Sequence, residues 1–125
     1  MSFPYQLVDR LVTVDPGVRA TATKHVSANE PYFVGHFPGI PVLPGVVLCE
    51  ALVQLGGHVA AAEGRLRLST IERARFRRPV VPGDCLHVRV TKQRHRRNVW
   101  RFEGRAEVRG QLMAEAVFAA MIMDD

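Results

Sequence analysis

The chain has few of the residues that would cross-link it or carry it through a membrane. It has 2 cysteines in 125 residues, and Cys49 lies in an apolar segment, where a free thiol behaves as a small core residue. We therefore expect no disulfide, and no spacing of cysteines and histidines predicts a metal site. No apolar run approaches the roughly 20 residues of a membrane-spanning helix, and the first residues lack the layout of a signal peptide. These absences predict a soluble, cytoplasmic protein.

Aromatic and acidic residues are also scarce, and this affects which partners we expect. Aromatics make up 7% of the chain, and 12 acidic residues face 17 lysines and arginines, so the formal charge is +5 and the pI about 10.0. The basic residues cluster in segments 73–78 and 92–97, which favours an acidic partner. The chain shows no recognition-helix pattern, no zinc spacing and no row of aromatics, so we do not expect nucleic acid. An acidic carrier protein remains a candidate partner. A simpler interpretation is that alternate arginines form the solvated face of a strand.

The chain reads as one domain over residues 1–125, without a linker, repeat or low-complexity segment. An apolar helix is predicted at 45–62, ending near Gly64, which can adopt the left-handed cap conformation. Turns are predicted at 15–17, 81–84 and 109–110. Strands are predicted at 7–12, 18–24, 68–76, 85–91, 99–108 and 111–122. One long apolar helix among antiparallel strands predicts an α+β domain whose sheet wraps the helix.

A rigid loop leads into this helix and carries a histidine. Residues 35–45 read Gly-His-Phe-Pro-Gly-Ile-Pro-Val-Leu-Pro-Gly, and the three prolines restrict the backbone around His36. In the helix, Glu50 and Gln54 interrupt the apolar pattern and are four residues apart, so they share a face. A buried carboxylate is costly, so Glu50 is paired, protonated or at a functional cavity; a hydrogen-bonded structural glutamate is the other reading.

Residues 35–46, followed by Glu50-Ala51-Leu52-Val53-Gln54, resemble the motif of the FabZ-type 3-hydroxyacyl-acyl-carrier-protein dehydratases. Segments 7–10, 29–33 and 74–84 resemble the same family, so the likeness spans most of the chain. The resemblance implies a hot-dog fold, in which an antiparallel sheet wraps one long central helix and two subunits join their sheets side by side.

The resemblance also implies a lyase of fatty-acid or polyketide-type chain assembly, which dehydrates (3R)-3-hydroxyacyl carrier-protein thioesters to trans-2-enoyl products. His36 matches the family's catalytic histidine, and Glu50 its catalytic acid, supplied there by the partner subunit. Gly45 matches the residue whose backbone N–H binds the substrate carbonyl. These groups provide the base, the acid and the oxyanion site that the chemistry needs, without a metal or cofactor. A single residue performing both proton transfers remains an alternative.

Further residues are candidates for binding the substrate and its carrier. Phe37 and Phe76 are candidates for lining an acyl tunnel, although each also suits the core, and Gln54 is a candidate for holding Glu50 or the loop, or is an ordinary interior amide. The arginines suited to an acidic carrier protein or its phosphopantetheine phosphate are Arg75, Arg77 and Arg78. For each single arginine, a solvated strand face is the alternative.

Two other functional classes fit parts of the sequence. A hot-dog thioesterase would act on the same acyl thioesters but needs an activated water or a carboxylate nucleophile. A catalytically inactive acyl-binding subunit is the non-enzymatic alternative, against which the presence of both His36 and Glu50 argues. We expect a homodimer or a trimer of dimers, with no nucleic acid and no membrane as partner.

Overall fold

A computed structural model describes residues 7–27 and 43–123 of the chain. The described part contains one helix, α1 (Gly45–Val59), and six strands. The strands are β1 (Arg10–Asp15), β2 (Arg19–His25), β3 (Leu66–Phe76), β4 (Cys85–Arg96), β5 (Val99–Val108) and β6 (Gln111–Ile122). The predicted α+β class is therefore confirmed.

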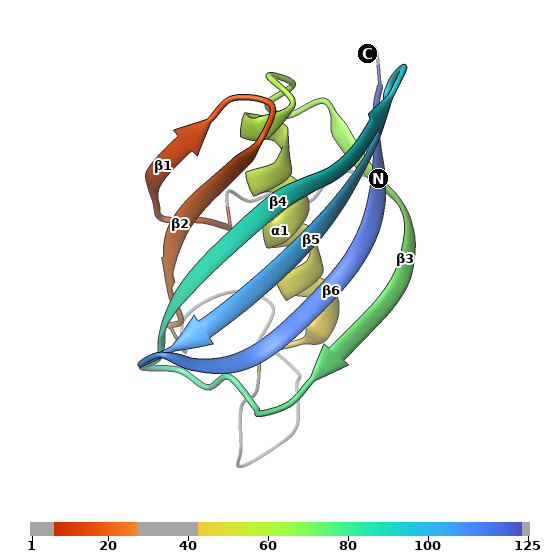
Figure 1. The fold of residues 1–125 in the computed structure, drawn as a ribbon. Coiled ribbons are helices and arrows are strands. Elements are labelled where there is room, and N and C mark those ends of the chain that lie inside the picture. The colour runs from red at the N-terminus through yellow and green to blue at the C-terminus, as the bar shows by residue number, and fades with distance from the viewer. Residues whose placement is uncertain (1–6, 28–42, 124–125) are drawn as a thin grey trace.

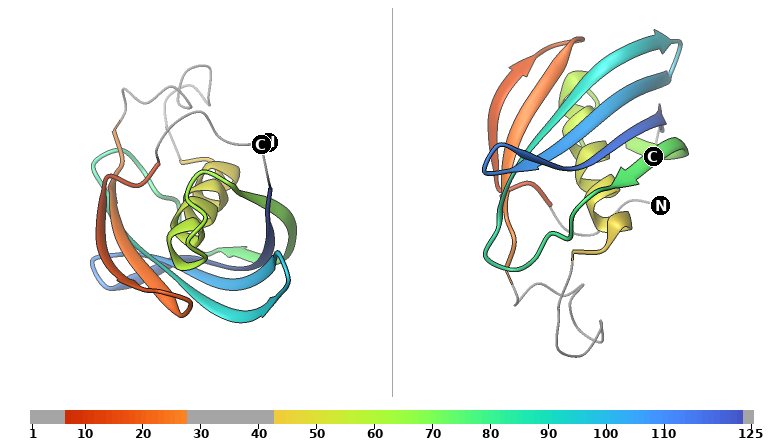
Figure 2. Two further views of the ribbon diagram at one scale, coloured as in Figure 1. Left: turned by 90° about the horizontal axis from the view of Figure 1, so that it is seen from above. Right: turned by 60° about the horizontal axis from the view of Figure 1, so that its bottom comes forward.

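All six strands form one antiparallel sheet, in the order β1-β2-β4-β5-β6-β3. The sheet curls around α1, and its outer strands approach the helix from opposite sides (Figure 1). The view along the helix in Figure 2 shows the same wrapping, which is the arrangement of a hot-dog fold. The strands β1 and β3 form the two edges of the described sheet.

The core lies between the inner face of the sheet and α1. Along β4 and β5, buried residues alternate with exposed or partly exposed ones, as a strand with one face on a core requires. Phe102 and Phe118 are fully buried on the inner face, and Leu52 and Leu55 face them from the helix. At Gly104 the helix comes so close that an added Cβ would lie 2.7 Å from Leu52 Cδ1. The helix and sheet thus pack without spare room.

The helix ends three residues earlier than predicted. Ala60 caps α1, and Ala61 rather than Gly64 adopts the left-handed conformation there, with φ of 53°. The N–H of Ala62 donates to the Gly57 carbonyl at 2.8 Å, which is the long hydrogen bond of a Schellman motif. The predicted glycine at position 64 also has a positive φ, of 75°, but it belongs to the following turn.

The predicted turns at 15–17 and 109–110 are present, and β3 and β4 are both longer than predicted. Arg109 and Gly110 both have positive φ and join β5 to β6, as a tight hairpin turn requires. The N–H of Gly17, in the turn between β1 and β2, donates to the Val59 carbonyl at 2.9 Å and so fastens that turn to the end of α1. β4 continues to Arg96, beyond the alternating apolar residues that predicted it.

Candidate active site

An apolar pocket of about 490 Å³ opens beside the start of α1. Leu43 and Leu48 line it from the helix side, and Phe76 and Val80 from the segment that ends β3 and follows it. The Leu43 N–H donates to the Val80 carbonyl at 2.7 Å, which ties the two walls together. Neither Leu43 nor Val80 was predicted as a site residue. Val80 lies within segment 74–84, which was compared only for its resemblance to the FabZ-type dehydratases.

Gly45 and Phe76, both predicted to bind substrate, meet in this pocket. An added Cβ at Gly45 would lie 2.8 Å from Phe76 Cζ, so the phenyl ring occupies the space that any larger residue at position 45 would need. The ring remains 54% exposed, so it can turn without disturbing the core. No described side chain caps the start of α1, and the N–H groups of Val47 and Leu48 both donate to the Pro44 carbonyl. The Gly45 N–H thus lies at the positive end of the helix, on the wall of the pocket.

Glu50 lies one turn further along α1 and is half-buried, but it does not line this pocket. Burial raises the pKa of its carboxyl above the ordinary value, while the positive charge of Arg67 acts in the opposite direction. The raised pKa favours the protonated form, which can donate a proton. The adjacent Cys49 is a buried, free thiol whose own pKa is raised by burial and by Glu50.

Gln54 holds the backbone at Leu7. Its Oε1 accepts a hydrogen bond of 2.7 Å from the Leu7 backbone N–H, and the Leu7 side chain is 1% exposed. This contact agrees with the interior-amide reading of Gln54, and its assignment as a substrate-binding residue stays a prediction.

The three candidate carrier-binding arginines separate into two groups. Arg77 and Arg78 line the rim of the apolar pocket, and Arg77 Nη2 lies 3.4 Å from Glu115 Oε1. Arg75 is exposed on β3 and does not line the pocket. The other two predicted residues, His36 and Phe37, lie outside the described residues.

Lys24 is a charged residue that the sequence reasoning overlooked. It is 1% exposed and lies on β2 in alternation with the buried Ala20 and Ala22. The alternation alone places position 24 on the inner face, so the signal was present in the sequence.

The described residues contain neither a cluster suited to a metal ion nor a helix suited to a membrane. Residues 7–27 and 43–123 contain no group of three or more histidine, cysteine, aspartate or glutamate side chains arranged to hold a metal ion. In the same ranges, no helix has the length and hydropathy that crossing a membrane requires.

Comparison with known proteins identifies the family. A family model described as the FabA-like domain matches residues 2–117. The protein named 3-hydroxyacyl-acyl-carrier-protein dehydratase FabZ from Rhodospirillum rubrum is 46% identical over 98% of this chain and 81% of its own length. The chain belongs to the FabA-like family, as a FabZ-type member. A FabZ from Oleidesulfovibrio alaskensis is 47% identical over 98% of this chain and 84% of that protein.

Solved structures confirm the hot-dog fold of this FabZ-type chain at much lower identity. A chain of the dehydratase heterocomplex ApeI:P from Xenorhabdus doucetiae is 21% identical, with a TM-score of 0.68 over 84% of this chain and 88% of that one. An uncharacterized protein from Pyrococcus horikoshii is 13% identical, with a TM-score of 0.76 over 95% of this chain and 85% of that one. At these identities the likeness concerns the fold alone.

Proposed function

We propose that this FabZ-type chain dehydrates (3R)-3-hydroxyacyl carrier-protein thioesters to trans-2-enoyl thioesters. The observation that carries the proposal is the apolar pocket at the start of α1, where the Gly45 backbone lies beside Phe76 and under the rim formed by Arg77 and Arg78. An acyl chain needs an apolar cavity, a developing enolate oxygen needs a hydrogen-bond donor, and a phosphopantetheine arm needs cationic groups at the entrance. The FabZ relative from Rhodospirillum rubrum, which is 46% identical over 98% of this chain, supports the same reaction.

The reaction moves two protons and expels water. In the proposed mechanism His36, as the neutral imidazole, removes the proton next to the thioester carbonyl. The Gly45 N–H, at the positive end of α1, stabilises the negative charge that develops on the carbonyl oxygen. Glu50 donates its proton to the leaving hydroxyl group, which departs as water. The direction of the Glu50 pKa supports this role, because an ordinary carboxyl would have lost its proton at neutral pH.

The position of Glu50 also bears on the assembly. Because Glu50 does not line the pocket beside Gly45 of its own chain, we assign it to the site of a partner subunit in a homodimer. Each of the two sites then combines His36 and Gly45 of one chain with Glu50 of the other.

A mixing experiment tests the shared sites. His36→Ala and Glu50→Gln proteins, each inactive alone, are dissociated, mixed in equal amounts and allowed to reassociate. Random exchange makes half of the dimers mixed, and each mixed dimer has one intact site, so about a quarter of wild-type activity should return. If each site used one chain only, no activity would return.

The basic rim suits an acidic carrier protein. Arg77 and Arg78 stand at the pocket entrance, where a guanidinium group can pair with the phosphate of the prosthetic arm or with carrier carboxylates. The proposal places the protein in the cytoplasm, as a single hot-dog domain over residues 1–125 that serves fatty-acid or polyketide-type chain assembly.

Mass spectrometry of the carrier-bound acyl chain tests the reaction. Incubation with 3-hydroxyacyl carrier proteins of several chain lengths should give an enoyl product lighter by one water, and both His36→Ala and Glu50→Gln should abolish it. Release of free acid would instead establish the thioesterase alternative. Binding of the acyl carrier without any turnover would establish the non-catalytic alternative.

A further inference from the structure

A second cluster of charged side chains lies on the outer face of the sheet, the face turned away from α1. In the register of β4 and β5, Arg89 stands directly opposite Arg105, and His87 directly opposite Glu107. The neighbouring residues Val88 and Ala106 are buried on the inner face, so these four side chains point outward. Like charges directly opposite each other destabilise a sheet, so the Arg89–Arg105 pair calls for an explanation.

These side chains line a hollow. It measures about 240 Å³ and extends over β1, β2, β4 and β5, with Val12 and Thr21 along its other side. A water molecule takes up roughly 30 Å³, so the hollow has room for a small ligand. It shares no lining residue with the apolar pocket at the start of α1. This hollow is therefore separate from the proposed site of dehydration.

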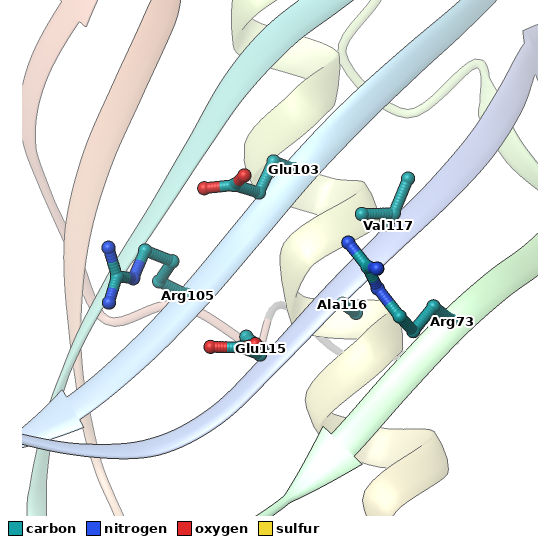
Figure 3. A pocket seen from close by; sticks show the side chains of 6 residues that line it. All are labelled: Arg73, Glu103, Arg105, Glu115, Ala116 and Val117. Carbon is teal, nitrogen blue, oxygen red and sulfur yellow. The ribbon is translucent and has the colours of Figure 1, made fainter.

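Arg105 links this hollow to a neighbouring one. The second hollow, of about 140 Å³, is lined by Arg105 together with Arg73, Glu103 and Glu115. Figure 3 shows these side chains on the near face of the sheet, with α1 behind, and the guanidinium group of Arg105 extending from β5 toward β4. Among the residues that the structure describes, the buried Arg105 Nε has no hydrogen-bond partner. A buried donor without a partner is uncommon in a folded protein.

Within the described residues, the carboxylates of this face form no ion pair with Arg89 or Arg105. Glu115 lies opposite Arg105 but pairs with Arg77, and Glu72 pairs with Arg101 at 2.6 Å. Glu103 and Glu107 flank Arg105 on its own strand, yet within residues 7–27 and 43–123 neither forms an ion pair with it. Arg89 likewise has no ion pair in these ranges. Two guanidinium groups thus line one hollow without a carboxylate partner among the described residues.

We propose that Arg89 and Arg105 form a binding site for the phosphate group of a small hydroxylated phosphate ester. The two Nη groups of Arg105 present donors to two phosphate oxygens, and Arg89 balances the second negative charge. Glu107, in the same hollow, accepts a hydrogen bond from a hydroxyl group of the ester. Glu107 also disfavours a simple anion that brings no donor of its own.

The buried Nε offers a direct spectroscopic test. The arginine Nε–Hε resonances of the 15N-labelled protein are followed by NMR during titration with glycerol 3-phosphate, against sodium chloride at equal ionic strength. The Arg105 resonance should shift to saturation with the phosphate ester only. Arg89→Met should weaken binding at least tenfold, whereas Arg96→Met, which removes the same charge from the exposed end of β4, should change it less than twofold.

Two further comparisons complete the test. Glu107→Gln should weaken binding of glycerol 3-phosphate more than binding of inorganic phosphate, and the reverse order would overturn the role of Glu107. Phosphopantetheine is titrated in parallel: tighter binding than glycerol 3-phosphate would identify the carrier's arm as the source of the phosphate, and weaker binding a free ester. An unshifted Arg105 resonance, an equal shift with chloride, or equal losses in Arg89→Met and Arg96→Met would refute the site.

Discussion

Adding one methyl group at Gly45 and one at Gly104 should have opposite consequences. At Gly45 the new Cβ would lie 2.8 Å from the Phe76 ring, which is 54% exposed and free to turn. At Gly104 the new Cβ would lie 2.7 Å from Leu52, which is 2% exposed and enclosed by the core. The same chemical change therefore meets a movable neighbour at one position and a fixed neighbour at the other.

The magnitudes follow from these neighbours. Because the exposed Phe76 ring can turn aside and no buried group is lost, the free energy of unfolding of Gly45→Ala should lie within about 1 kcal/mol of that of wild type. Its kcat/KM for dehydration should fall by about tenfold or more, or about 1.4 kcal/mol of transition-state stabilisation, because the methyl group and the displaced ring obstruct the oxyanion site. Gly104→Ala should lose about 1–3 kcal/mol of stability through overpacking and retain its activity while folded.

Urea denaturation and steady-state kinetics on the two variants test this reasoning. The expected result is a loss of activity without a loss of stability at Gly45, and the opposite at Gly104. Full activity in Gly45→Ala would refute the assignment of its N–H to the oxyanion site. A Gly104→Ala protein as stable as wild type would refute the tight packing against Leu52.

Three further predictions concern the remaining site residues. Burial raises the pKa of Glu50, so the folded protein binds this proton more tightly than the unfolded chain does. The stability that this proton contributes is present below the ordinary carboxyl pKa and is lost as pH rises through the raised pKa. Across this window, denaturation curves should show the free energy of unfolding of Glu50→Gln rising relative to that of wild type, and a constant difference would contradict the burial effect. Gln54→Leu should cost about 1–3 kcal/mol in urea denaturation because the buried Leu7 N–H loses its acceptor, and an unchanged midpoint would contradict that role. Arg78→Met should raise KM for a carrier-bound substrate at low salt and leave kcat unchanged. A change in kcat alone would refute the role of Arg78 in binding the carrier.

The sequence predicted the fold well where one periodicity dominates. β5 and β6 have the bounds that alternation and the turn at Gly110 predicted, because every second residue packs on the core. β4 was predicted too short, since its continuation, residues 92–96, is polar and largely exposed and contains a bulge. Backbone pairing with β5, rather than burial, holds that continuation in the sheet.

The site was predictable only in part, for a physical reason. Motif and helix position identified Gly45 and Phe76, which do meet. Spacing along the chain does not say how the end of β3 lies against α1. The placement of Arg77 at the pocket and of Arg75 away from it depends on that packing. The outer-face pair depends on the register of β4 against β5, which no local pattern specifies.

The fastening of the end of α1 to the turn at Gly17 limits how the pocket can be redesigned. The Schellman motif and the Gly17–Val59 hydrogen bond hold the far end of the helix in place, so α1 has little freedom to slide along its own axis. Engineers who wish to change the preferred length of acyl chain should therefore leave the helix in position. Room at the pocket would come from substituting Phe76 or Leu48, whose side chains form its walls.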